Sequence, residues 1–402
     1  MNKPSLLSQS ALVMLAGFLI LFITGGSRFA IGLIVKPMVD DLGWERGTLS
    51  FAIAMFMVVS AVAMFIAGRL TDRFNARDVL AAGTVASAFG IGAISLASEP
   101  WHVILLFGIV FAIGNGMASL TPVSVLITRW FPGRTGLANG IAVSGMGLGQ
   151  LMMVAVLAVI LVAIGWRSVF LWLGIFNLLL LPVVLLGISG GRNGTGSGPT
   201  TQPLTGMTLG EAARTPAFWL LLASYAICGF QDFFVSTHVV AFAMDKGVET
   251  YAAGTLLALM GLTGVAGVIA AGAWSDRTGP GWPLFASFAM RFALFALILI
   301  DQHVGSVAGF ALGFGITFWM AAPLTVIFVR DHFGTRNLGA ISGLITMVHH
   351  IAGGIGTYIG GVLFDRSGNY DTVFWTMAAL SLLAMAASLA LTRPAPAAPA
   401  AG

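Results

Sequence analysis

The six residues Gly68–Arg73, with the sequence GRLTDR, recur in related form as Gly272–Arg277, GAWSDR, 204 positions further along the chain. Each copy follows a long apolar run. Two further sets keep almost the same spacing: Asp41–Gly43 with Asp245–Gly247 at an offset of 204, and Gly136 and Gly140 with Gly339 and Gly343 at an offset of 203. One spacing kept across several hydrophilic turns indicates that the chain is a duplicated unit.

The composition around these turns excludes a water-soluble protein. Of the 402 residues, 58% are hydrophobic and only 8% are charged, whereas soluble domains carry about 25% charged residues. A bilayer cannot satisfy a bare backbone, so the spans are helices or a closed barrel. Continuous apolar runs favour helices and predict an all-α membrane protein with twelve spans: 11–38, 48–67, 79–97, 101–128, 137–163, 168–189, 216–243, 251–271, 282–301, 305–329, 338–362 and 372–392.

The longest polar break divides these spans into two sets of six. It runs from Gly190 to Arg214 and is rich in Gly, Thr, Ser and Pro, a composition typical of flexible linkers. We therefore predict an N-terminal bundle at 1–190, a cytoplasmic linker at 191–214, a C-terminal bundle at 215–393 and a disordered tail at 394–402.

The distribution of Lys and Arg predicts the orientation. With the N-terminus in the cytoplasm, twelve of the nineteen basic residues fall on the cytoplasmic side and five on the outer side, as the positive-inside rule requires. Both termini are then cytoplasmic, and we expect a multi-pass protein of a bacterial inner membrane. The single cysteine, Cys228, excludes a disulfide framework. Without a Walker lysine, ATP-driven transport has no support, and neither a cofactor nor a nucleic-acid partner is expected.

The turn motif resembles the signature of the major facilitator superfamily, Gly-x-x-x-Asp-Arg-x-Gly-x-Arg/Lys. Gly68, Asp72, Arg73 and Arg77 match it, and Asn75 replaces the second glycine. Asn is the non-glycine residue best suited to a left-handed position, so the turn is expected to persist. The stretch 130–145, WFPGRTGLANGIAVSG, resembles the entry to span five of the monocarboxylate porter family, and the oxalate/formate antiporter-type branch is similar in overall pattern.

This resemblance implies a fold and a mechanism. The fold is two six-helix bundles around a central cavity, usually monomeric, which exchange access by a rocker switch. Gly68, Asp72 and Arg73 would act in gating. Spans one and seven would face each other across the cavity.

Three charged residues fall inside predicted spans: Arg28, Asp232 and Arg291. A charge at the bilayer centre costs at least about 2.5–3.5 kcal/mol, so each needs a partner or a water-filled cavity. Arg28 and Asp232 are 204 positions apart and thus equivalent in the two repeats. We hypothesise that Arg28 binds a substrate carboxylate with its planar fork. Asp232 would pair with Arg28 or carry a coupling proton, or the two would form only a static ion pair.

Other residues are weaker candidates for the cavity. Histidine titrates near neutral pH, so His238 is a candidate for substrate binding and proton coupling, and of the adjacent His349 and His350 only one is expected to face the cavity. The remaining candidates for substrate contact are polar or aromatic: Gln231, Asn115, Trp319 and Arg291. No metal site is predicted, since no Cys or Glu joins the histidine pair at ligand spacing.

Together these features predict a secondary transporter of small organic anions, most simply monocarboxylates, coupled to protons. Two interior arginines against one carboxylate leave the cavity positive, which favours an anion. The alternatives are a proton-coupled efflux antiporter of drugs or cations, with Asp232 binding the cation, and an organic-anion exchanger. A membrane receptor or enzyme is the third class, but the sequence carries no catalytic constellation and the chain is predicted not to be an enzyme.

Overall fold

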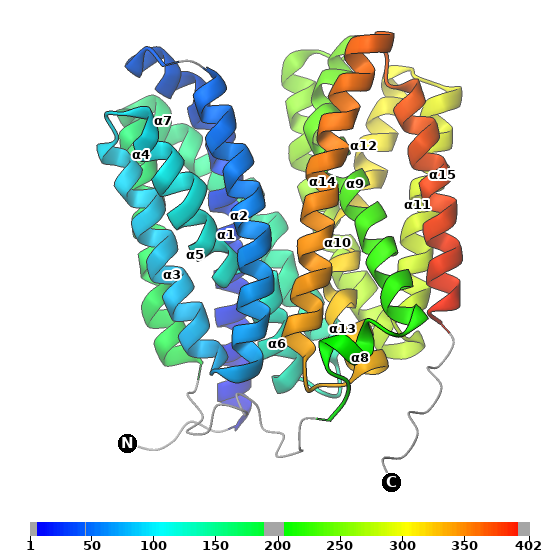
Figure 1. Ribbon diagram of the computed structural model, residues 1–402. Coiled ribbons are helices and arrows are strands. Elements are labelled where there is room, and N and C mark those ends of the chain that lie inside the picture. The colour runs from blue at the N-terminus through cyan, green and yellow to red at the C-terminus, as the bar shows by residue number, and fades with distance from the viewer. Residues whose placement is uncertain (1–5, 45, 189–204, 393–402) are drawn as a thin grey trace.

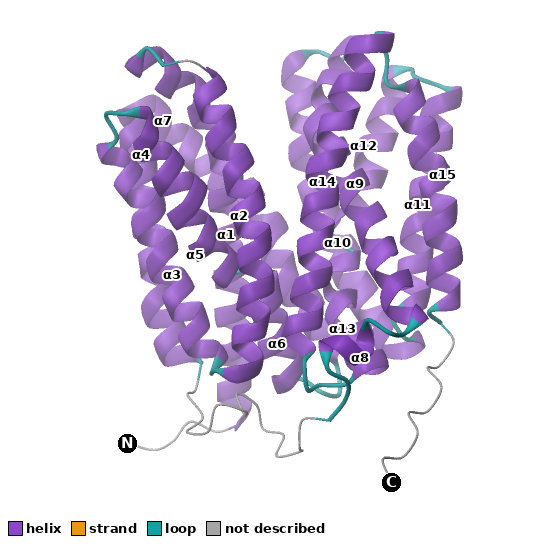
Figure 2. Cartoon of the chain, viewed as in Figure 1, coloured by secondary structure: helices purple, strands orange, loops and turns teal. Residues whose placement is uncertain are grey.

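The computed structural model describes residues 6–44, 46–188 and 205–392, and within them the chain is almost entirely helical (Figure 2). The first half comprises α1 (Leu6–Leu42), α2 (Arg46–Arg73), α3 (Ala76–Gly92), the 3-10 turn η1 (Ala93–Leu96), α4 (Pro100–Leu105), the π-helical η2 (Leu106–Phe111), α5 (Ala112–Met117), α6 (Leu120–Trp130) and α7 (Thr135–Gly187). The remainder comprises α8 (Leu209–Ala212), α9 (Pro216–Asp245), α10 (Thr250–Thr278), α11 (Gly281–Ile300), α12 (Val304–Phe318), α13 (Ala321–Phe333), α14 (Leu338–Ser367) and α15 (Asp371–Ala390).

The predicted all-helical class is confirmed. Eleven helical segments of the described chain are long and apolar enough to cross a membrane. One of them, α7, contains both predicted spans five and six, because its 53 residues are broken at Gly165, where φ is +80°. That backbone angle is readily adopted only by glycine. Counting α7 as two spans gives the twelve that were predicted.

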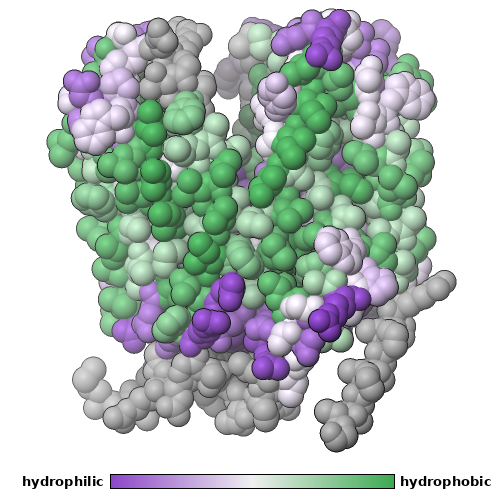
Figure 3. Space-filling view, in the orientation of Figure 1, coloured by the Kyte–Doolittle hydropathy of each residue, from purple (hydrophilic) through white to green (hydrophobic). Residues whose placement is uncertain are grey.

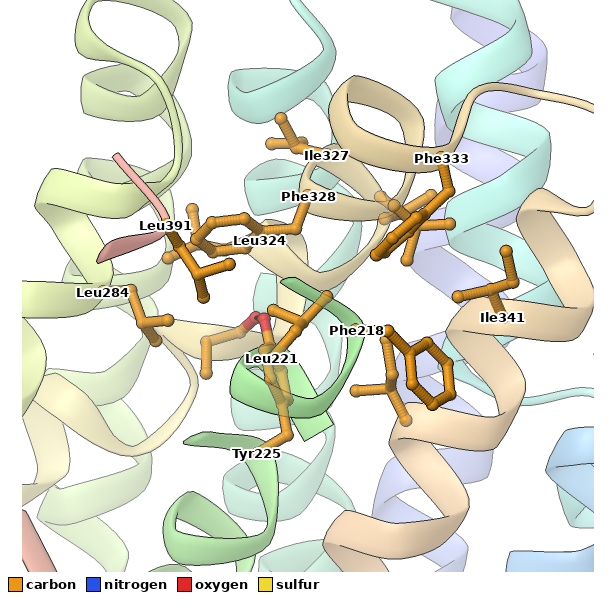
Figure 4. Packing of buried hydrophobic residues seen from close by; sticks show 14 of the residues in the cluster. Phe218, Leu221, Tyr225, Leu284, Leu324, Ile327, Phe328, Phe333, Ile341 and Leu391 are labelled. Atoms are coloured by element: carbon orange, nitrogen blue, oxygen red, sulfur yellow. Dashed lines mark hydrogen bonds between the residues drawn. The ribbon is translucent and has the colours of Figure 1, made fainter. Parts of the chain in front are cut away.

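The two halves lie side by side, α1–α7 in one and α9–α15 in the other (Figure 1). Each half contains a hydrophobic cluster of its own. In the second half, Phe218 and Tyr225 of α9 pack against Leu324 and Phe328 of α13 (Figure 4). The Tyr225 hydroxyl donates a hydrogen bond to the carbonyl oxygen of Ala321 at 2.7 Å, which satisfies the one polar group that this ring brings into the core.

Large apolar side chains also cover the outside of the molecule. Phe89, Val162 and Leu186 are among those that are exposed. Figure 3 shows a broad hydrophobic band around both halves, with hydrophilic residues gathered at its two ends. Such a surface would aggregate in water and is suited to contact with lipid.

At one end of the bundle the two halves touch through glycines. A Cβ at Gly68 of α2 would collide with the carbonyl oxygen of Gly339 of α14, and a Cβ at Gly136 of α7 would collide with that of Gly272 of α10. The absence of side chains therefore lets α2 approach α14 and α7 approach α10. At the opposite end Figure 3 shows a notch between the halves.

One predicted feature at this end of the bundle needs correction. Asn75 does not adopt a left-handed conformation: its φ is −65°, and its side chain caps α3 by accepting a hydrogen bond from the Arg77 N–H at 3.0 Å. A short polar residue thus serves this turn as a helix cap.

The predicted linker 191–214 lies partly outside the described residues, as does the predicted tail 394–402. Residues 205–214 are described, and they are anchored. The Met207 N–H donates to the Phe333 carbonyl oxygen at 2.8 Å. The Thr208 backbone N–H and hydroxyl both donate to Glu211, which holds the pKa of that carboxyl below its ordinary value.

Candidate functional site

A cavity of about 390 Å³ lies between the two halves. Its wall is formed by both halves. The first half contributes residues of α1, α2, α5, α6 and α7, and the second half contributes residues of α9, α10, α12, α13 and α14. Most of the lining is apolar and includes Phe56, Phe233 and Phe318. The polar lining includes Thr24, Arg28, Asn115, Ser119, Asp232, Thr346, His349 and His350.

Arg28 of α1 reaches this cavity, as predicted from its place in the repeat. Its Nη1 atom lies 3.1 Å from Nε2 of His350 on α14, and its guanidinium lies 5.1 Å from the centre of the Phe233 ring. Arginine can only donate, so His350 Nε2 accepts, and His350 Nδ1 donates to the Thr346 carbonyl oxygen at 2.9 Å. This pattern requires a neutral imidazole and joins the two halves across the cavity.

Asp232 of α9 also lines the cavity, but its ion-pair partner differs from the predicted one. Its Oδ1 atom lies 2.7 Å from Nη2 of Arg291 on α11. The predicted pairing of Asp232 with Arg28 is therefore wrong in this structure. The repeat places Arg28 and Asp232 on equivalent spans, but it carries no information about α11, which brings a second arginine against the same carboxylate.

Arg291 does not reach the cavity, so its predicted contact with substrate is also not found. The side chain is fully buried behind Asp232. Four hydrogen bonds engage its guanidinium, two to Thr317 and one each to Gln231 and the Cys228 carbonyl oxygen. The surrounding acceptor oxygens hold Arg291 as a fixed counter-ion.

Gln231 and His238, both predicted to contact substrate, face away from the cavity. Gln231 is buried and donates to the Met377 carbonyl oxygen and to Ser381 of α15. His238 contacts the Tyr370 hydroxyl at 3.1 Å and lies beside a small separate void. The two residues share one face of α9, but that face packs against other helices of the same half.

His349 and His350 both line the cavity, whereas only one of them was expected to. His349 Nδ1 lies 3.2 Å from the Tyr225 carbonyl oxygen, and its Nε2 lies 3.9 Å from Asp232 Oδ2. The cavity wraps around this part of α14, so neighbouring side chains reach it from two sides. His349 thus stands beside Asp232 and His350 beside Arg28.

Cys228 brings a third donor to this corner of the cavity. Its Sγ atom lies 3.3 Å from Asp232 Oδ2, and the ligand atoms of Cys228, Asp232 and His349 all lie within 4.8 Å of one another. Thiol, carboxylate and imidazole form a donor set that suits a transition metal, and the prediction of no metal ligands near the histidines did not foresee it. The Arg291 guanidinium on the same carboxylate opposes the binding of a cation there.

Asn115 and Trp319 line the cavity, in agreement with their predicted positions. Asn115 donates to the Thr24 carbonyl oxygen at 3.2 Å. The Trp319 ring packs against the backbone at Gly147 and Gly264, where a Cβ would meet the indole. Each residue stands at an interruption in a span, Asn115 just before the break between α5 and α6 and Trp319 in the break between α12 and α13.

The predicted gating motif lies at the end where the halves touch. The Asp72 carboxylate accepts the backbone N–H groups of Gly339 and Ala340 at 2.9 and 2.7 Å. Asp276, in the second copy of the motif, accepts those of Gly136 and Leu137 at 2.7 and 2.9 Å. We call these two carboxylates and the four N–H groups the latch. Each carboxylate satisfies N–H groups in the first turn of a helix in the opposite half.

Of the other residues at this end, Arg129 and Asp276 were not predicted to take part. Arg129 Nη2 lies 3.5 Å from Asp72 Oδ1. Asp276 could have been found, because it stands 204 positions after Asp72 in the same motif. Arg73, which was predicted to act in gating, is exposed and makes no ion pair with a described residue.

Comparison with known proteins agrees with this architecture. A family model described as Major Facilitator Superfamily matches residues 17–357 and again residues 271–402. The chain belongs to the Major Facilitator Superfamily. Human monocarboxylate transporter 11 is 25% identical over 379 residues, covering 91% of this chain and 79% of its own length. The uncharacterised MFS-type transporter YcxA of Bacillus subtilis is 24% identical over 351 residues, covering 83% of each chain.

A solved structure supports the same fold. The Escherichia coli fucose:proton symporter FucP superposes with a TM-score of 0.73 at 16% identity, over 97% of this chain and all of that one. At this identity the likeness concerns the fold alone. The superfamily and the monocarboxylate branch named by the sequence motifs are both supported, and the chain is a membrane transporter rather than an enzyme.

Proposed function

We propose that this chain is a secondary active transporter of small organic anions, with monocarboxylates as the first class to test. The observation that carries the proposal is the charge around the cavity. Arg28 and Asp232 line it, and Arg291 stands 2.7 Å from Asp232 just outside it. These three groups sum to one positive charge, which attracts an anion. The names of relatives such as human monocarboxylate transporter 11 support the same class.

Arg28 is the proposed carboxylate ligand. A guanidinium binds a carboxylate through two parallel hydrogen bonds, and in this cavity His350 and the Phe233 ring hold it in place. An incoming carboxylate would replace or share the contact with His350. Substrate binding would then act on a side-chain contact that joins α1 to α14.

Proton coupling is proposed for Asp232 together with His349. His238, the other predicted proton carrier, lies away from the cavity and is not retained for this role. His349 Nε2 stands 3.9 Å from Asp232 Oδ2, so a small movement would bring the two within hydrogen-bonding distance. Access would alternate by a rocker switch, with Gly68 and Asp72 holding the latch closed in the state described here.

The rival substrate class is a cation or cationic drug bound by Asp232. It is less well supported, because the Arg291 guanidinium already balances that carboxylate. The remaining elements of the proposal are a monomer in a bacterial inner membrane, with both termini in the cytoplasm, a domain boundary at the 191–214 segment, and protons as the coupling ion.

Uptake of radiolabelled monocarboxylates into proteoliposomes tests the proposal. Saturable uptake by the wild type, lost in Arg28→Ala and retained in Arg366→Ala, is the expected result; Arg366 is an exposed arginine at the end of α14. Uptake that survives Arg28→Ala, or that is absent for every carboxylate, would overturn the anion assignment.

The role of Asp232 is tested in the same vesicles with an imposed pH gradient. Asp232→Asn alone leaves Arg291 without its counter-ion, so the double variant Asp232→Asn/Arg291→Gln is measured beside it. Uptake in either variant that no longer responds to the gradient supports coupling through Asp232. An unchanged response in a folded variant would remove that assignment.

A further inference from the structure

Two spans of this protein are interrupted where they meet the cavity. Span four breaks between α5 and α6, where Ser119 is extended with φ −100° and ψ −175°. Span ten breaks between α12 and α13 at Trp319. Residues on both sides of each break line the cavity. The N-termini of α6 and α13, each with a partial positive charge, therefore lie at the cavity wall.

Ser119 stands at the N-cap of α6 but does not cap it. A serine at this position ordinarily accepts a hydrogen bond from the N–H of the second or third helical residue. Here the third residue is Pro122, which has no N–H, and the Ser119 side chain makes no cap bond. The first turn of α6 and the Ser119 hydroxyl are thus both left without the usual local partner.

The Ser119 hydroxyl has no hydrogen-bond partner among the described residues, although Ser119 is only 5% exposed and lines the cavity. A buried polar group left unpaired costs about 1–3 kcal/mol. Trp319 is in the same position: the residue lines the cavity, and its indole Nε1 is buried with no partner among these residues. Two such donors, one from each half and both in residues that line the cavity, point to an acceptor that the described residues do not supply.

Ser119 and Trp319 line the same cavity as Arg28, but they lie one or two helical turns away from the level of Arg28. Asn115, one turn before Ser119, donates to the Thr24 carbonyl oxygen, and Thr24 is one turn before Arg28 on α1. Thr121 of α6 contacts Thr346, whose carbonyl oxygen binds His350. One or two helical turns correspond to roughly 5–10 Å, which is the expected separation between the Arg28 guanidinium and the start of α6.

We propose that the start of α6 is a second substrate subsite, with Ser119 and Trp319 as its hydrogen-bond donors. The preferred substrate is then a carboxylate whose apolar or aromatic body carries a second hydrogen-bond-accepting oxygen at the far end. The size and apolar lining of the cavity fit such a compound, since about 390 Å³ lies within the range of pockets that enclose drug-sized ligands. This inference rests on the proposed function, in which Arg28 binds the carboxylate.

The test compares three compounds in proteoliposomes. 3-Phenylpropionate has only the carboxylate, 3-(4-hydroxyphenyl)propionate adds an oxygen at the far end of the ring, and 3-phenylpyruvate adds one beside the carboxylate. The wild type is expected to take up the 4-hydroxyphenyl compound with a KM about fivefold lower than the unsubstituted one, the contribution of about one hydrogen bond. The oxygen of phenylpyruvate is too near Arg28 to give this gain.

Variants identify the groups responsible. Ser119→Ala is expected to abolish the fivefold ratio, and Trp319→Phe, which keeps a ring but removes the N–H, to reduce it. Ser124→Ala is the matched control, because Ser124 is also a buried serine of α6 whose hydroxyl has no partner in the described part of the chain, but Ser124 does not line the cavity. It should keep the wild-type ratio.

The outcomes separate the two proposals. If uptake of all three compounds depends on Arg28 but the wild type shows no preference, or Ser119→Ala keeps it, the subsite is refuted and the anion transporter stands. If no compound shows uptake that depends on Arg28, both proposals fail.

Discussion

Asp72 and Asp276, 204 residues apart, hold the two halves together by the same pair of bonds made in opposite directions. Each carboxylate accepts the N–H groups of the second and third residues of a helix in the other half, Asp72 on α14 and Asp276 on α7. Each therefore acts as a helix cap supplied from outside the helix.

Neutralising a latch carboxylate should favour the state in which this end of the bundle is open. Asp72→Asn and Asp276→Asn each replace charge-assisted bonds worth about 1.5–3 kcal/mol, and Asp72→Asn also removes the partner of Arg129. Spin-label distances between α2 and α14 at this end should broaden towards longer values. Asp78→Asn, on the exposed face of α3, is the control, and identical distributions in all three variants would refute the latch.

The glycine contacts should matter for the same equilibrium through sterics rather than charge. Gly68→Ala places a Cβ against the Gly339 carbonyl oxygen, whereas Gly254→Ala on α10 meets nothing within 4 Å. We expect Gly68→Ala to open the latch end in the same distance measurement, and Gly254→Ala to leave it closed. Equal behaviour of the two alanine variants would argue against close backbone approach as a determinant of the closed state.

Arg291 should be needed for stability. Removing it leaves the Asp232 carboxylate in a buried site without its counter-ion, which costs about 3–5 kcal/mol. We expect Arg291→Ala to lower the thermal unfolding temperature in detergent strongly, and the double variant Arg291→Met/Asp232→Leu to recover much of the loss. The control is Arg214→Ala, an exposed site. A normal unfolding temperature for Arg291→Ala would show that Asp232 is solvated or protonated instead.

His350 should affect affinity through Arg28. Its neutral imidazole accepts from the guanidinium at 3.1 Å and so helps to hold the guanidinium in place. His350→Ala should therefore raise KM about three- to tenfold with little change in kcat. His349 lies beside the Tyr225 carbonyl oxygen and Asp232 instead, so His349→Ala should not show this KM effect; if both histidine variants change KM equally, the positioning role is wrong.

The repeat predicted more of this structure than the composition did. The offset of 204 relates Asp72 to Asp276, and the offset of 203 relates Gly136 to Gly339, so both sides of the latch could have been found from the sequence, although only Asp72 was predicted to act there. The interior position of Arg28 was visible too, since a charge inside an apolar run needs a cavity or a partner.

The partners of the interior charges were not predictable in this way. A repeat relates equivalent spans of the two halves but gives no information about contacts within one half. It therefore suggested Arg28 as the ion-pair partner of Asp232, whereas the partner in the structure is Arg291 of α11. Periodicity gave Gln231 and His238 a common face of α9, but which face meets the cavity depends on how α9 packs. The packing of α14 likewise lets both His349 and His350 reach the cavity, which the sequence alone did not indicate.

The crossed arrangement of the latch has a consequence for the origin of the fold. When patch A of one unit binds patch B of a second, and patch B of the first binds patch A of the second, the interface is isologous. The bonds from the Gly339 N–H to Asp72 and from the Gly136 N–H to Asp276 have this reciprocal arrangement between the two halves of one chain. Two identical six-helix subunits could associate as a symmetric homodimer through the same contacts, and a fused pair retains them with freedom to change one half at a time. That freedom is visible in Arg28 and Asp232, which occupy equivalent positions with opposite charge.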